Sequence, residues 1–353
     1  MIHPRYFSTG NNAHISCDLC PRRCVIAPLK AGNCGVRQNR DGTPELPFSG
    51  FVTALAVDPI EKKPLYHFRP GTDILSAGFA GCNLRCPFCQ NWHISQAIHD
   101  QSADAPGRRY SPTELIGAAL HAGEAGEKPA IAYTYSEPLV HIEFLLDSMA
   151  EARKAGVANV LVSNGCVNTE AAAEVLDLCD AANIDLKCFS EETYSETLGG
   201  DLRTVIDFIH LALEKGVHIE ITTLIVPGLN DSEAELNKCR DFTAELETGG
   251  KPVPWHLSAY RPEYKWKAPP TDNAFLIALA RRFREKLTYV YTGNSAPPVG
   301  EPEFNDSFCP HCGKTLVSRR GYRIKTPGLS LKTDKGKSAC FCAYCGREAL
   351  FRA

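Results

Sequence analysis

The sequence predicts an α/β protein built around a partial (β/α)6 TIM-like barrel, with a small cysteine-rich module on either side. Two observations predict this fold. Short apolar runs alternate with helix-like stretches between about residues 72 and 292, and nearly every run ends in polar residues. Strands and helices that alternate at this spacing form parallel β/α units. An open doubly wound sheet shares the pattern, but polar groups at successive strand ends favour a barrel, which places its active site there.

The elements can be taken in chain order. The runs that predict strands are Ile74–Phe79, Ala130–Tyr135, Ala158–Ser163, Ala182–Leu186, His218–Val226, Trp255–Tyr260 and the shorter Leu287–Tyr291. The stretches that predict helices are Pro112–Ala122, Leu139–Ala155, Thr169–Cys179, Thr204–Lys215, Ser232–Leu246 and Asp272–Lys286. Ser111-Pro112 suits a helix start, and Gly156 and Gly216 suit helix ends. We expect the barrel to cover residues 72–293, with modules at 1–71 and 294–353.

Composition and charge narrow the class of protein. The chain has 353 residues, of which 44% are hydrophobic and 22% are charged, with a net charge of −3. The mixed charge argues against a broad nucleic-acid-binding face. No apolar run approaches the ~18 residues of a membrane helix, and no apolar stretch after the start suggests a signal peptide. We therefore expect a cytoplasmic protein that binds neither nucleic acid nor a membrane.

The sixteen cysteines are unusual for such a protein. The cytosol keeps thiols reduced, so clustered cysteines there are more often metal ligands than disulfides. Twelve of them fall into three clusters, near residues 17–34, 82–89 and 309–345. The other four are expected to be small buried side chains: Cys166, Cys179, Cys188 and Cys239.

The central cluster directly follows the first predicted strand. Cys82, Cys86 and Cys89 have the spacing C-x3-C-x2-C. Three thiolates on one short loop can bind three irons of a [4Fe–4S] cluster and leave the fourth iron open to a substrate or cofactor. A zinc site completed by His67 or His93 is the alternative.

This loop resembles the C-x3-C-x-φ-C signature of the radical S-adenosylmethionine (SAM) superfamily, with Phe88 at the aromatic position. The resemblance implies that SAM binds the open iron and that the reduced cluster cleaves it to methionine and a 5′-deoxyadenosyl radical. That radical abstracts a hydrogen atom from the substrate. Short motifs at later strand ends resemble those of the superfamily, which implies further cofactor-binding residues: Ser136, Glu137, Ser163, Asn164, Asp185, Lys187 and His256. For Glu137 the implied role is to hold the amino group of SAM, as a carboxylate can.

Nearly the whole chain resembles one narrower group, the AmmeMemoRadiSam radical SAM proteins, which are related to pyruvate formate-lyase activating enzyme. Ser163 replaces the usual Thr, and Cys166 stands where an aromatic residue is common. The resemblance implies a small-molecule or protein substrate, an electron donor such as flavodoxin or ferredoxin, and Memo-type and Ammecr-type partners. Activation of a glycyl radical enzyme is one alternative function. A non-catalytic zinc-ribbon interaction protein is another.

The two flanking clusters also predict metal sites. Two C-x2-C-G knuckles near the C-terminus contain Cys309, Cys312, Cys342 and Cys345. Four thiolates suit structural zinc, with rubredoxin-type iron as the alternative, and Cys340 is either a spare thiol or an alternative ligand. The N-terminal cysteines have the spacing C-x2-C-x3-C-x9-C, which predicts zinc, an auxiliary iron–sulfur cluster or plain reduced thiols: Cys17, Cys20, Cys24 and Cys34.

Overall fold

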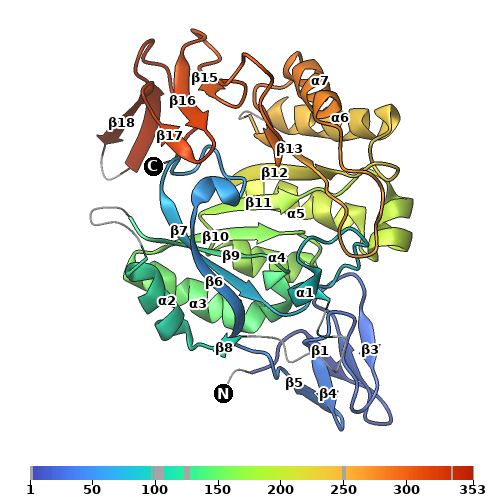
Figure 1. Cartoon of the computed structure of the whole chain (residues 1–353). Coiled ribbons are helices and arrows are strands. Elements are labelled where there is room, and N and C mark those ends of the chain that lie inside the picture. The colour runs from blue at the N-terminus through green and yellow to red at the C-terminus, as the bar shows by residue number, and fades with distance from the viewer. Residues whose placement is uncertain are drawn as a thin grey trace.

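A nine-stranded sheet forms the centre of the computed structural model (Figure 1), which describes residues 3–96, 98, 107–122, 128–248, 252–334 and 337–352. Seven strands run parallel in chain order. They are β7 (Asp73–Phe79), β9 (Ala130–Thr134), β10 (Ala158–Ser163), β11 (Ala181–Asp185), β12 (His218–Ile225), β13 (Trp255–Ala259) and β14 (Val290–Gly293). The α/β prediction is confirmed, because six β/α units precede the last strand.

Two antiparallel strands extend the sheet beyond β7. β6 (Phe51–Pro59) pairs with β7, and β8 (Arg108–Arg109) pairs with the start of β6. β6 belongs to the segment that we predicted to lie in the N-terminal module, yet it is hydrogen-bonded to the central sheet. With β8 at one edge and β14 at the other, the sheet remains open and is not a closed barrel.

The helices connect the parallel strands and pack against them or against one another. They are α2 (Pro112–Leu120), α3 (Ile142–Ala155), α4 (Thr169–Leu176), α5 (Leu202–Glu214), α6 (Glu233–Thr248) and α7 (Asn273–Arg284). Ser111 and Glu114 form a capping box that starts α2, and Gly156, with a φ of 72°, ends α3 in the left-handed conformation. Short helical turns complete the set: η1 (Ile60–Lys62), α1 (Trp92–Ser95), η3 (Pro138–His141) and η4 (Thr193–Leu198).

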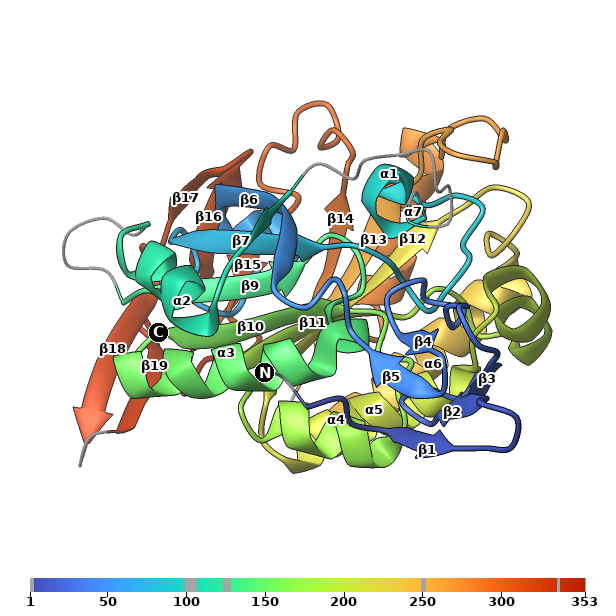
Figure 2. The same ribbon diagram turned by 90° about the horizontal axis from the view of Figure 1, so that it is seen from below.

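The parallel strands supply the core because both of their faces are covered. Every residue of β9 is buried, and β10 is buried except for Val162. Such strands read as continuous apolar runs in the sequence. α3, α4 and α5 lie along one face of the sheet (Figure 2), and the polar carboxyl ends of the strands are left to form a site. Within the described ranges, no helix is both long and apolar enough to cross a membrane.

The two cysteine-rich segments lie at opposite ends of the molecule (Figures 1 and 2). The N-terminal segment contains an antiparallel sheet of β1 (Phe7–Thr9), β2 (Ile15–Cys17) and β3 (Cys24–Ile26), and a hairpin of β4 (Gln38–Arg40) and β5 (Thr43–Glu45). The C-terminal segment contains β15 (Ser307–Phe308), β16 (Thr315–Arg320) and β17 (Arg323–Lys325), followed by a hairpin of β18 (Leu329–Asp334) and β19 (Lys337–Cys342).

The C-terminal segment is fastened to the sheet by buried polar contacts. Arg319 of β16, 4% exposed, donates to the carbonyl oxygen of Tyr66 at 2.8 Å. The ring of His67 lies 2.6 Å from the carbonyl oxygen of Leu350 and 2.6 Å from the hydroxyl of Tyr291 on β14. These contacts place the segment beside the central cavity.

Candidate active site and metal centres

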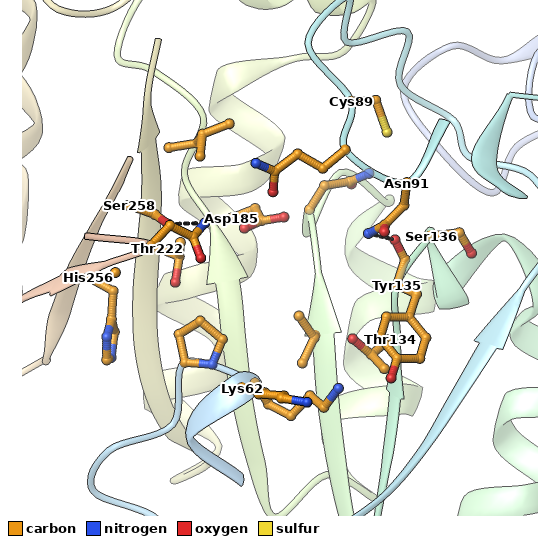
Figure 3. Close-up of a pocket in the computed structure, with 18 of the residues that line it drawn as sticks. Lys62, Cys89, Asn91, Thr134, Tyr135, Ser136, Asp185, Thr222, His256 and Ser258 are labelled. Atoms are coloured by element: carbon orange, nitrogen blue, oxygen red, sulfur yellow. Dashed lines mark hydrogen bonds between the residues drawn. The ribbon is translucent and has the colours of Figure 1, made fainter. Parts of the chain in front are cut away.

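A cavity of about 560 Å³ lies at the carboxyl ends of the parallel strands, and each of these strands or the loop after it contributes a residue. Figure 3 shows Cys89 at one end, Lys62 at the other, and Ser136 and His256 on opposite sides. The volume is in the range of about 300–1,000 Å³ that is usual for small-molecule sites. Its position agrees with the expectation from the polar strand ends.

The three cysteines of the loop after β7 line one end of this cavity. Burial raises the pKa of the Cys86 thiol to about 12 and raises that of Cys82 well above its usual range. The Sγ atom of Cys82 accepts hydrogen bonds from the N–H of Leu84 at 3.4 Å and the amide of Asn164 at 3.7 Å. Such donors favour thiolates bound to a metal, whose binding displaces the thiol protons.

The spread of these sulfurs suits a cluster better than one metal ion. Around a single zinc ion, with Zn–S bonds of about 2.3 Å, tetrahedral sulfurs lie about 3.8 Å apart. The sulfurs of Cys82, Cys86 and Cys89 do not all lie within 4.8 Å of one another. Nor do they form such a group with other possible metal ligands among the described residues. In an iron–sulfur cluster each thiolate binds a different iron, which allows a wider spacing. No fourth cysteine appears among the described residues that line this cavity.

The histidines that could complete a zinc site lie elsewhere. His67 is fully buried and already lies within hydrogen-bond distance of Leu350 and Tyr291, and it does not line the cavity. His93, in α1, is also absent from the cavity lining. The geometry therefore does not favour the zinc alternative at this loop.

Five other predicted cofactor residues line the same cavity: Phe88, Ser136, Asn164, Asp185 and Lys187. The hydroxyl of Ser136 donates to the carbonyl oxygen of Phe79 at 2.6 Å, so its lone pairs remain available to a ligand. Lys187 pairs with Asp185 at 2.6 Å. Burial alone would lower the pKa of Lys187, but the neighbouring Asp185 carboxylate and Cys86 raise it above its usual value. Lys187 therefore stays charged beside the cysteines.

Glu137 and Ser163 are close to this group but do not line the cavity. The carboxylate of Glu137, 1% exposed, accepts hydrogen bonds from the N–H of Leu139 at 3.0 Å, the hydroxyl of Ser163 at 2.7 Å and the N–H of Asn164 at 2.8 Å. Burial raises the pKa of Glu137 to about 7, and these three donors oppose the rise. In this arrangement Glu137 joins the loops after β9 and β10, and its contact with SAM stays a prediction.

We expect Glu137→Gln to lower the free energy of unfolding by about 1–3 kcal/mol. The NH2 group of the new glutamine would face an N–H group whose hydrogen bond the carboxylate now accepts. Urea unfolding of the reconstituted protein measures this change. Direct contact with the amino group of SAM predicts instead a ten- to hundredfold loss of SAM affinity, equal to roughly 1.5–3 kcal/mol. Weaker SAM binding at unchanged stability would contradict the bracing role.

His256 also lines the cavity, as predicted for a cofactor residue, and Glu220 of β12 orients its ring. Its Nε2 atom lies 2.7 Å from the Glu220 carboxylate. Glu220 is fully buried, accepts the backbone N–H groups of Tyr66 and His67, and lies 3.0 Å from His218. Burial opposes ionisation, but the two histidine contacts hold the pKa of Glu220 well below its usual range.

A group of charged residues at the far end of the cavity was not predicted from the sequence. Asp58 binds Lys62 at 3.0 Å and Lys63 at 2.8 Å, and it accepts the hydroxyl proton of Tyr135 at 2.6 Å. All four residues line the cavity, as does Tyr322 from the C-terminal segment. Burial opposes ionisation of Asp58, yet these hydrogen bonds lower its pKa. Tyr135 ends a run that we predicted to be a strand, but nothing in the sequence indicates where β6 and η1 lie.

The C-terminal cysteines form a compact set that could hold a metal ion. The sulfurs of Cys309, Cys312, Cys342 and Cys345 all lie within 4.8 Å of one another, and the pairs Cys309–Cys345 and Cys312–Cys342 are each 3.7 Å apart. Those distances agree with the edge of about 3.8 Å of a zinc–thiolate tetrahedron. Both knuckles have the same fold, with Gly313 and Gly346 at positive φ and donating to the first cysteine of each knuckle. Cys340 is buried in the module's apolar core and is not part of this set.

The N-terminal cysteines form a different kind of group. Cys17, Cys20, Cys24 and Cys34 line one small cavity together. Their sulfurs do not all lie within 4.8 Å of one another, so this part of the described chain does not show the compact geometry of the C-terminal site.

Comparison with known proteins identifies the family. The model of the radical SAM superfamily matches residues 78–238. An uncharacterized protein of Methanocaldococcus jannaschii is 35% identical over 350 residues, which cover 99% of this chain and 98% of that protein. The pyruvate formate-lyase-activating enzyme of Listeria monocytogenes is 26% identical over 234 residues, 59% of this chain and 88% of that enzyme. The crystal structure of Streptococcus suis SuiB has a TM-score of 0.47 at 14% identity, over 67% of this chain and 52% of that one.

The chain therefore belongs to the radical SAM superfamily, and this membership supports an enzyme. Within the superfamily it is similar to pyruvate formate-lyase-activating enzymes over about half its length and to the archaeal protein over nearly all of it. The narrower AmmeMemoRadiSam assignment and the Memo-type and Ammecr-type partners stay predictions, as does the cytoplasmic location.

Proposed function

We propose that the protein reductively cleaves SAM at a [4Fe–4S] cluster bound by Cys82, Cys86 and Cys89, and that the resulting radical abstracts hydrogen from a substrate in the central cavity. One observation carries this proposal. Three buried or half-buried cysteines, with no fourth among the described lining residues, end a cavity into which the polar groups of successive strands converge. That arrangement supplies three ligands and space for a fourth from a small molecule.

A [4Fe–4S] cluster held by Cys82, Cys86 and Cys89 would supply the one-electron chemistry that cleaves a carbon–sulfur bond of SAM to give methionine and a 5′-deoxyadenosyl radical. The protein's own residues orient these cofactors. The amide of Asn164 and the N–H of Leu84 stabilise the Cys82 thiolate. Ser136 and the Asp185–Lys187 ion pair offer an acceptor, an anion and a cation to SAM beside the cysteines. Glu137 positions Asn164 through its backbone N–H.

The far end of the cavity is the proposed substrate site. There Asp58, Lys62, Lys63 and Tyr135 form one hydrogen-bonded group, and His256 faces it across the cavity. A polar molecule or a polar protein segment could bind these groups. Activation of a glycyl radical enzyme remains a second candidate, favoured by the similarity to pyruvate formate-lyase-activating enzymes. A flavodoxin or ferredoxin is the proposed electron donor.

At the C-terminal cysteines we propose a structural zinc ion. Its four thiolates close the coordination sphere, as is usual for structural rather than catalytic zinc. The ion would stabilise a module with a small apolar core of its own.

Anaerobic reconstitution with iron and sulfide tests the main proposal. We expect the reduced holoenzyme to convert SAM to equal amounts of methionine and 5′-deoxyadenosine, measured by liquid chromatography and mass spectrometry. A protein that assembles an oxygen-sensitive cluster but forms no 5′-deoxyadenosine with a strong reductant would contradict it. Transfer of deuterium from a candidate substrate to the 5′-carbon would then identify the substrate.

A further inference from the structure

The four N-terminal cysteines come from separate parts of a small fold and converge on one cavity. Cys17 ends β2 and Cys24 begins β3, and the two are directly opposite each other in the hairpin. Cys20 lies on the turn between these strands, and Cys34 comes from the loop that precedes β4. Cys17 is 6% exposed and Cys34 is 7% exposed. Four converging, largely buried thiols form a ready set of metal ligands.

The spacing of this set indicates more than one metal atom. A single zinc ion needs all four sulfurs about 3.8 Å apart, as in the C-terminal site. The N-terminal sulfurs are not gathered within 4.8 Å, although they share one cavity. Among the described residues, the cysteines of the central loop likewise do not form a set within 4.8 Å. In an iron–sulfur cluster each thiolate binds a different iron, which accounts for the wider separation of the sulfurs in both groups.

Hydrogen-bond donors approach two of the four sulfurs. The guanidinium of Arg37, 1% exposed, donates to Cys17 Sγ at 3.2 Å while it binds Glu143 through two further bonds. The N–H of Asn33 donates to Cys24 Sγ at 3.4 Å. Donors to sulfur stabilise thiolates and tune the potential of iron–sulfur clusters, whereas apolar core thiols need none.

The N-terminal group directly contacts the loop of the central cysteines. Asn83, next to Cys82, lines the N-terminal cavity. Its carbonyl oxygen accepts the side-chain amide of Asn33 at 3.0 Å. The carbonyl oxygen of Cys34 lies 2.5 Å from where a Cβ would stand on Gly81, whose φ is +82°. Only glycine fits this close approach, so the two loops pack backbone to backbone.

We propose that Cys17, Cys20, Cys24 and Cys34 bind a second iron–sulfur cluster, closed by four thiolates, that passes single electrons to the central site. A one-electron donor protein of the flavodoxin or ferredoxin type reduces this cluster by one electron and is itself oxidised by one. The same electron then moves to the central cluster, and the N-terminal cluster returns to its oxidised state. The relay rests on the proposed function, whereas the second cluster does not.

The cluster can be tested without the central site. We expect the triple variant Cys82→Ala, Cys86→Ala, Cys89→Ala to bind about four irons and about four acid-labile sulfides after anaerobic reconstitution. Its reduced electron paramagnetic resonance signal should not change when SAM is added. Adding Cys17→Ser and Cys34→Ser to the triple variant should abolish both its acid-labile sulfide and its electron paramagnetic resonance signal. Adding Cys179→Ser instead is the matched control, because this buried thiol belongs to no cluster and should leave both intact.

Each outcome decides a separate point. A triple variant without acid-labile sulfide, whether it holds only the zinc of the C-terminal site or a second zinc as well, would overturn the second cluster. A wild-type protein without SAM cleavage, beside a triple variant that keeps its cluster, would reject the proposed function alone. For the relay, we expect Cys34→Ser to lower the ratio of flavodoxin-driven to dithionite-driven SAM cleavage at least tenfold, and Cys179→Ser to leave it unchanged. An unchanged ratio in Cys34→Ser would overturn the relay.

Discussion

Alanine at Cys82, Cys86 or Cys89 should abolish the cleavage of SAM, a loss of at least a thousandfold, and remove the part of the oxygen-sensitive absorbance that belongs to the central cluster. Each thiolate binds a different iron, so no neighbouring sulfur can take its place. No fourth cysteine is among the described residues lining the cavity that could rescue the site. The measurement is the amount of 5′-deoxyadenosine formed under anaerobic conditions by each reconstituted variant.

Cys239→Ala is the matched control for these variants. Cys239 is 1% exposed and lies in α6, far from any cluster in the sequence. Its loss leaves a small cavity and costs some stability, but it should leave SAM cleavage in place. Normal 5′-deoxyadenosine formation in any one of the three cysteine variants would contradict the assignment of the cluster ligands.

Loss of the C-terminal metal is expected to have the next largest effect. Structural zinc sites contribute apparent binding free energies of about 10–16 kcal/mol, which become folding free energy. Cys312→Ser should therefore remove about one zinc per chain and unfold residues 307–351 or make them aggregate. Metal analysis and the rate of proteolysis within β16 to β19 measure these effects.

Cys340→Ala tests the same module without touching a ligand. Cys340 is buried in the apolar core of the module, where it is 5% exposed. Its sulfur does not belong to the group of four that could bind the metal. We expect this variant to keep its zinc and to be only mildly destabilised. Equal zinc loss in both variants would show that Cys340 is a ligand, and full zinc retention in Cys312→Ser would contradict the proposed site.

The repeating part of the fold was predictable because its strands are buried on both faces. Ala158–Ser163 was predicted and is β10 to the residue. The prediction failed for β6, whose residues are largely half-buried or exposed, so its apolar pattern does not distinguish an edge strand from part of a small module. A helix end was also overestimated: α4 stops at Leu176 rather than Cys179, since Asp177 is its C-cap.

For the candidate site, the sequence shows which residues carry chemistry but not which way their side chains point. Asn164 and Glu137 both follow predicted strands, yet Asn164 lines the cavity and Glu137 turns to brace two loops. Asp58 and Lys63 were missed, because an antiparallel strand outside the repeat brings them to the cavity. Tyr322 was missed for the same reason, since only tertiary packing unites it with the barrel.

Tyr322 has a practical consequence. It stands at the turn between β16 and β17, yet it lines the central cavity, with Lys62 5.5 Å from its ring centre. The pocket is thus lined both by the central sheet and by the C-terminal segment. A chain shortened after β14 would lack Tyr322, and its pocket would be open at that end. A screen for the natural substrate should therefore use the chain with residues 294–353 included and with the proposed zinc ion bound.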